Sequence, residues 1–351
     1  MISRSRRSAG RYGIAAAVAA LACGAPAIPD VPAASGRATE RAAATITPED
    51  LYARIAFLAD DALGGRATPS PGLEVAAAYL ASEFLRMGLQ PAGDGTGYLQ
   101  RYPVVVRGSN GGTTHHAPNV VAVLPGSDSV LRNTYIVFSA HFDHVGIGRP
   151  DAYGDSIYNG ADDDASGTAA IMEIAEAFAS LPVPPARSLV FLAVSGEERG
   201  LLGSRHFADH PTVPADAIVA NINLDMIGRN APDSIVAIGQ QFSSLGPLVQ
   251  EVARRRPELG LTVADDLWPE ENFFFRSDHF SFARLEIPAI FFFAGVHEDY
   301  HRPSDHVDDI DTDKTARVAR LVFWLGHAIA TEPMPPSWSA EGLARVRELT
   351  R

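Results

Sequence analysis

Long apolar runs alternate with amphipathic segments over most of this chain. The runs are rich in Val, Ile, Phe and Ala and are bounded by turn residues, which is typical of strands buried on both faces. They occupy residues 134–143, 188–198, 217–228 and 287–301. The amphipathic segments at 167–181, 203–210, 243–256 and 312–331 read as helices. The alternation predicts an α/β fold, with a largely parallel or mixed sheet covered by helices on both faces.

The N-terminal part of the chain has a different pattern. Thr47 and Asp50 resemble a capping box that opens a helix ending near Ala59, and a second helix is predicted from about Gly72 to Met87. Residues 97–106 and 117–126 look like antiparallel strands. Beyond Trp338 a short amphipathic helix is expected.

Residues 1–27 have the features of a signal peptide. Several arginines precede an apolar stretch at 14–22, which is followed by small residues suited to cleavage and is too short to span a bilayer. We therefore expect an exported protein, periplasmic or secreted. A second processing site would leave Cys23 first and open to lipid anchoring. No other run is long and apolar enough to predict an integral membrane span.

The rest of the chain reads as one catalytic domain with short extensions. Residues 28–45 are Ala/Pro-rich and predict a flexible spacer, 46–335 the catalytic domain, and 336–351 a C-terminal helical tail. Cys23 is the only cysteine, so the mature domain has no internal disulfide. The formal net charge of −13 argues against nucleic acid as a partner. We favour a monomer.

Residues that bind divalent metals stand at the ends of the four apolar runs. Ligands gather beyond the carboxyl ends of strands in open α/β sheets, and a cluster of imidazoles and carboxylates suits Zn²⁺ or a similar ion. A glycine-flanked acidic turn adds three more carboxylates. The candidates are His141, Glu197, Glu198, Asp225 and His301, with Asp162, Asp163 and Asp164 in the turn. The pattern predicts a metallohydrolase.

The residue types suggest a division of roles. His141 reads as a ligand and Asp143 as the carboxylate that orients it, although His144 is also available. Of the adjacent Glu197 and Glu198, one would bind metal and the other move protons. Helix capping explains one aspartate of the acidic turn, and a second could bridge two ions, but spacing does not choose between them.

Five ordered motifs resemble the co-catalytic zinc exopeptidase family, which contains bacterial leucyl aminopeptidases, glutamate carboxypeptidase and glutaminyl cyclase. The motifs are SAHFDHVG, NGADDDASGTAA, VSGEERGLLGSRHF, NINLDMIG and YHRPSD, and the resemblance covers roughly residues 51–330. It implies a mixed sheet of about eight, mostly parallel strands between helices. Many exported relatives carry a protease-associated domain for which residues 102–133 leave no room.

The resemblance also implies a role for each candidate residue. Asp163 would bridge two Zn²⁺ ions, His141 and Asp225 would complete one site, and Glu198 and His301 the other. Glu197 would be the general acid/base, with Asp143 orienting His141.

The expected reaction is hydrolysis of the N-terminal peptide bond of a peptide by a metal-bound hydroxide. An apolar first residue is expected because Phe273, Phe274, Phe275, Phe292 and Phe293 are candidates for the substrate pocket, although most could belong to the core. A carboxypeptidase, for which Arg229 and Arg276 could bind the substrate carboxylate, is one alternative. Glutaminyl cyclase and a catalytically inactive binding homologue are the others.

Overall fold

The computed structural model describes residues 33–108 and 111–350, built around one large sheet. The expected signal peptide and Cys23 lie outside these residues. In the described part, the sheet has nine strands in the order β1-β3-β7-β4-β8-β11-β9-β10, with β2 also paired to β3. Its strands are β1 (Gln90–Pro91), β2 (Leu99–Gly108), β3 (Gly111–Leu124), β4 (Tyr135–His141), β7 (Ser188–Val194), β8 (Ile218–Leu224), β9 (Ser234–Ile238), β10 (Thr262–Ala264) and β11 (Ala289–Phe293).

The four predicted apolar runs form the parallel centre of this sheet. β7, β4, β8 and β11 are neighbours that run parallel, whereas β3 and β9 pair antiparallel to its two sides. This confirms the mixed α/β sheet. Because these central strands are parallel, their carboxyl ends meet at one edge of the sheet.

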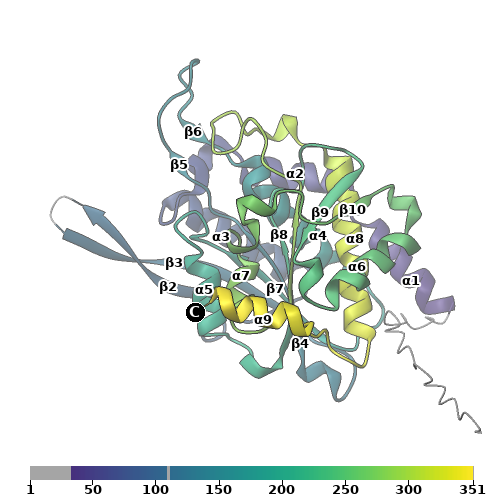
Figure 1. Cartoon of the computed structure of the whole chain (residues 1–351). Helices are drawn as coiled ribbons and strands as arrows, with labels where there is room; N and C mark the ends of the chain where they lie inside the picture. The colour runs from purple at the N-terminus through teal and green to yellow at the C-terminus, as the bar shows by residue number, and fades with distance from the viewer. Residues whose placement is uncertain (1–32, 109–110, 351) are drawn as a thin grey trace, which may run out of the picture.

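Helices cover both faces of the sheet (Figure 1). One face packs on α2, α3, α4, α6 and α8 through the largest apolar cluster, which includes Phe138 and Phe191. The other face packs on the shorter α5, α7 and α9. The helices are α1 (Ala33–Ala44), α2 (Pro48–Leu58), α3 (Pro71–Arg86), α4 (Gly167–Ala179), α5 (Leu202–Asp209), α6 (Leu245–Arg255), α7 (His279–Ala283), α8 (Thr312–Thr331) and α9 (Ala340–Leu349).

The local signals at the N-terminal side are confirmed. The side chain of Thr47 accepts a hydrogen bond from the backbone N–H of Asp50 and caps α2, as the capping box predicts. β2 and β3 form the predicted antiparallel pair, a ribbon that projects from the body of the protein in Figure 1. It occupies most of the stretch from 102 to 133.

Residues 33–44 differ from the expected flexible spacer, because they form helix α1. This helix contacts α4 and α8 and buries Ala42 and Ala43. The physical reason is that the segment is rich in Ala, the strongest helix former, and has no Pro between Pro32 and Pro48. None of the described helices is long and apolar enough to cross a membrane.

Candidate metal and catalytic site

The predicted site residues come together at the carboxyl edge of the central strands. His141 ends β4, Glu197 and Glu198 follow β7, and Asp225 follows β8. The acidic turn precedes α4, and His301 lies in the loop after β11. A side chain from each of these places therefore reaches one cluster, which is mostly buried.

The three aspartates of the acidic turn have separate partners. Asp164 accepts backbone N–H bonds from Gly167, Met226 and His141 at 2.9, 3.1 and 3.2 Å, so both of its oxygens are used. Asp162 accepts the N–H of Gly228 at 2.7 Å. Asp163 alone of the three points its carboxylate at several imidazoles.

Asp163 lies between two groups of ligand-type atoms. Its Oδ1 is 3.2 Å from Nε2 of His141, which is 3.5 Å from Oδ1 of Asp225. Its Oδ2 is 3.1 Å from Nε2 of His301, which is also 3.1 Å from Oε2 of Glu198. Each oxygen of the Asp163 carboxylate thus faces a different group, an arrangement suited to bridging two cations.

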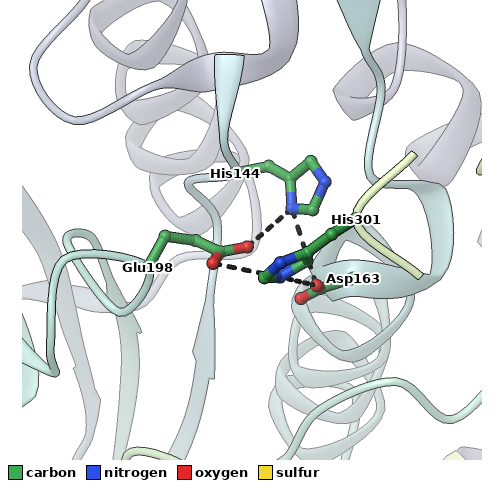
Figure 2. Close-up of side chains that lie close together, drawn as sticks. All are labelled: His144, Asp163, Glu198 and His301. Carbon is green, nitrogen blue, oxygen red and sulfur yellow. Dashed lines mark ion pairs between the residues drawn. The ribbon is translucent and has the colours of Figure 1, made fainter. Parts of the chain in front are cut away.

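His144 joins the second group, as Figure 2 shows. Its Nδ1 is 2.8 Å from Oε1 of Glu198 and 3.7 Å from Oδ2 of Asp163. Burial acts to raise the pKa of Glu198, but the neighbouring imidazoles of His144 and His301 reverse this and lower it. Burial acts to lower the pKa of His301, yet Asp163 and Glu198 raise it to about 10.

Asp143 contacts both His141 and the turn that carries Glu197. Nδ1 of His141 is 3.1 Å from the backbone carbonyl of Asp143 and 3.7 Å from its Oδ1. The same Oδ1 accepts the N–H of Glu197 at 3.3 Å. The hydroxyl of Thr68 donates to Oδ2 at 2.8 Å and accepts the N–H of Gly196 at 3.0 Å. Asp143 and Thr68 therefore hold β4 and the loop after β7 in a fixed relation.

Glu197 lines a pocket next to His141, Asp163 and Asp225. Burial raises the pKa of Glu197 well above its usual value, and the negative charges of Asp278, Asp225 and Glu198 act in the same direction against the opposing effect of His141. A carboxyl group in this environment binds a proton more readily than an exposed glutamate does.

A chain of buried side chains ends on Asp225 and was not predicted from the sequence. Asn221 donates to Ser139 at 2.9 Å, and Ser139 donates to Asn223 at 2.7 Å. Asn223 donates to Ser277 at 2.8 Å, and Ser277 donates to Oδ2 of Asp225 at 2.7 Å. The only sequence signal was a pair of asparagines inside an otherwise apolar strand.

Two more supporting residues were missed. Asp305, within the predicted YHRPSD motif, accepts the backbone N–H groups of Asp162 and Asp163 at 3.1 to 3.2 Å. Arg66 is fully buried and donates to the carbonyls of Phe142, Asn159 and Gly160 at 2.8, 2.6 and 3.0 Å. Arg66 thus ties the His141 loop to the acidic turn, but no pattern distinguishes it in the sequence.

The pocket beside the cluster has aromatic walls. Phe273 and Phe293 line it, as does Phe291, which was not a candidate. Phe292 packs in the core on the opposite face, because neighbouring strand residues point to opposite sides of a sheet. Phe274 is also buried. The further lining residues are Met226, Arg276, Val296 and Tyr300.

The cluster suits divalent cations. Among the described residues, both ring nitrogens of His144, Oδ2 of Asp163 and Oε1 of Glu198 are buried without a hydrogen-bond partner. Such groups are costly to bury unless something else satisfies them. The donors are imidazoles and carboxylates, the set that zinc and similar ions prefer. The geometry thus fits the sequence-predicted metals.

Comparison with known proteins agrees with this chemistry. The model of peptidase family M28 matches residues 119–325. A probable zinc metalloprotease of Pyrenophora teres f. teres (strain 0-1) is 40% identical over 111 residues, which are 32% of this chain and 23% of that protein. Aminopeptidase YwaD of Bacillus subtilis (strain 168) is 26% identical over 224 residues, 60% of this chain and 44% of YwaD. The chain spans about half or less of these relatives' lengths.

The fold also matches solved structures. The LapA aminopeptidase of Legionella pneumophila superposes with a TM-score of 0.64 at 21% sequence identity, over 85% of this chain and 75% of LapA. At this identity the match supports the fold and not the substrate.

Proposed function

Because the chain belongs to peptidase family M28, we propose that it is an exported zinc-dependent aminopeptidase that removes apolar N-terminal residues from peptides. The observation that carries the proposal is the position of Asp163, with one oxygen facing His141 and the other facing His301. Such a carboxylate can hold two divalent ions beside Glu197, the half-buried acid of the pocket.

Two zinc ions would share Asp163. His141 and Asp225 would complete one site, and Glu198 and His301 the other. Support comes from the short distances within each group, none longer than 3.5 Å between the atoms that face each other. When bound, the ions would polarise the scissile carbonyl and acidify a water molecule.

Glu197 would act as the general base and then as the general acid. Its carboxylate accepts a proton from the attacking water and passes it to the nitrogen of the leaving amine. The raised pKa of Glu197, caused first by burial, suits a group that must gain and lose a proton in one cycle. Asp143 would keep His141 oriented, chiefly through its backbone carbonyl, and its carboxylate would fix the backbone of Glu197.

The acidic lining of the pocket supports recognition of a free amine. Glu197, Asp163 and Asp225 all border it, and a protonated or metal-bound α-amino group can sit against them. A peptide anchored by its N-terminus places its first peptide bond at the cluster. This favours an aminopeptidase over an endopeptidase.

The carboxypeptidase alternative depends on an arginine that lines the pocket. Arg229 is paired with Asp299 at 2.7 Å and does not line the pocket. Arg276 does line it, half-exposed above the ring of Phe273, where its Nη1 lies 3.6 Å from Oε2 of the exposed Glu271. Arg276 is therefore the one candidate of the two that could receive a substrate carboxylate, and blocked peptides test it.

The proposal predicts cleavage from the amino end only. Purified, zinc-loaded protein is expected to remove the first residue of a peptide such as Leu-Ala-Ala-Phe, and to leave its N-acetylated form nearly intact, because acetylation removes the amine charge. Mass spectrometry of timed digests measures both. Digestion of the acetylated peptide from its C-terminus would establish the carboxypeptidase instead, and no cleavage of either would favour a cyclase or a binding protein.

The aromatic walls predict the preferred first residue. Amides of Leu, Met or Phe should be hydrolysed with higher kcat/KM than those of Asp or Glu, since each buried methylene contributes about 1 kcal/mol. Phe273→Ala should reduce the preference for Phe over Ala amides at least about fivefold. Phe275→Ala is the matched control, because Phe275 packs on Phe274 and Phe280 and does not line the pocket. An equal loss in both variants would contradict this assignment.

Export and domain organisation remain proposals based on the sequence. We propose that residues 1–27 direct export to the periplasm or medium and that 46–335 form the catalytic domain without an inserted protease-associated domain. The helix α1 belongs with that domain, because it packs on α4 and α8.

A further inference from the structure

The sequence offers His144 only as an alternative to His141, and the proposed mechanism gives it no role. His144 lies in the loop after β4, only 1% exposed. Its ring approaches Asp163, Glu198 and His301, and Figure 2 shows all four side chains converging. Ligand-type atoms of these four residues lie within 4.8 Å of one another.

The residues around His144 leave a space that fits its ring. A Cβ on Gly160 would lie 2.5 Å from Cγ of His144, so glycine at 160 leaves the space that the ring fills. The backbone N–H of His144 donates to the carbonyl of Arg66 at 3.3 Å, and Arg66 itself holds the carbonyl of Gly160. The ring is therefore held in place by backbone contacts and not by a bond to its nitrogens.

The ring nitrogens of His144 have no hydrogen-bond partner among the described residues. Although Nδ1 is 2.8 Å from Oε1 of Glu198, the pair lacks hydrogen-bond geometry, and both atoms have no hydrogen-bond partner among the described residues. A buried imidazole with two unsatisfied nitrogens is costly. A nitrogen and an oxygen that converge without bonding to each other are instead arranged as two ligands of a shared cation are.

We propose that His144 is a fourth protein ligand of the metal ion held by Asp163, Glu198 and His301. The proposal rests on the proposed two-metal site and deepens it. The two positions then differ in the number of protein ligands. One has four, as closed sites do, and the other has the three proposed ligands His141, Asp163 and Asp225, with a position free. The four-ligand position should bind metal more tightly, and the three-ligand position should exchange it first.

Metal titration of the whole chain tests the proposal. Metal-free wild-type protein titrated with Co²⁺ should bind two ions in separate steps. Visible absorption and calorimetry measure both steps. His144→Phe should weaken the tighter step by more than about 10²-fold, beyond the 10–100-fold loss typical of residues that only orient a ligand. His306→Phe removes a half-exposed imidazole away from the cluster and should leave both steps unchanged.

A second variant tests coordination directly. With Cys23, the only cysteine, replaced by Ser, His144→Cys should give a near-ultraviolet thiolate-to-cobalt charge-transfer band when Co²⁺ binds. Its absence in a folded, cobalt-binding variant would overturn the proposal, as would wild-type affinity in His144→Phe. If His144→Phe does not fold, the cysteine variant decides. If the wild-type protein binds no metal, the proposed function itself fails. This outcome differs from failure of the His144 proposal alone, in which the wild-type protein still binds metal.

Discussion

Glu197→Gln is expected to lower kcat by at least about 10²-fold while the protein keeps its full metal content. The reason is that glutamine fills the same volume but cannot accept and return a proton. Glu197 lies at no ion-pair distance from any imidazole of the cluster, unlike Glu198, so its loss should not remove a ligand. Steady-state kinetics with a Leu amide and metal analysis by plasma mass spectrometry measure the two effects.

Glu198→Gln is the matched control, since it makes the same chemical change one residue away. Because Glu198 faces His301 and His144 at 3.1 and 2.8 Å, its variant should lose metal affinity, and added zinc should restore part of its activity. Near-normal turnover of Glu197→Gln, or rescue of that variant by zinc, would show that the two roles are assigned wrongly.

The centre of the fold was predictable because burial leaves a simple signal. β4, β7, β8 and β11 are covered on both faces, so each is a largely apolar run. The carboxyl ends of such strands meet, and the sequence therefore located the edge where the cluster lies. β9, only five residues long, and the shorter β10 carried too little pattern to be identified.

In the acidic turn, spacing alone could not identify the bridging aspartate, and only the family resemblance implied Asp163. Asp162, Asp163 and Asp164 are chemically equal in the sequence, and the backbone of the turn alone gives them different directions. Asp163 and Asp164 have φ values of −105° and −127° with ψ of 94° and 52°, outside helical geometry, although the segment leads into α4. No spacing rule predicts which carboxylate then meets the imidazoles.

Residues that hold the site were harder to predict than those that form it. Ser277 contacts Asp225 across 52 positions, and Arg66 reaches the carbonyl of Gly160 across 94. Each is an isolated polar residue whose partner is a long-range neighbour or a backbone carbonyl, and such contacts leave no periodic signal. Phe291 illustrates the same limit, because strand direction, and not composition, decides which ring faces the pocket.

Asp163→Asn should have the largest effect on metal binding of any single change, because one carboxylate is proposed to serve both ions. Wild-type protein is expected to hold about two zinc ions per chain after dialysis and to lose activity on chelation. An amide is neutral and offers only one oxygen, so both sites should weaken, each by more than about 10²-fold. Plasma mass spectrometry after dialysis and isothermal titration with zinc measure the loss.

Asp164→Asn provides the comparison within the same turn. Asp164 also has an oxygen near His141 and Asp225, which makes it the competing ligand. Its oxygens accept backbone N–H bonds from Gly167, Met226 and His141, however, and a carboxylate engaged in this way has little capacity left for a cation. We therefore expect Asp164→Asn to lower thermal stability and to retain both ions. Loss of an ion from Asp164→Asn with retention of both in Asp163→Asn would reverse the assignment, and one zinc or none in active wild-type protein would exclude the bridged pair.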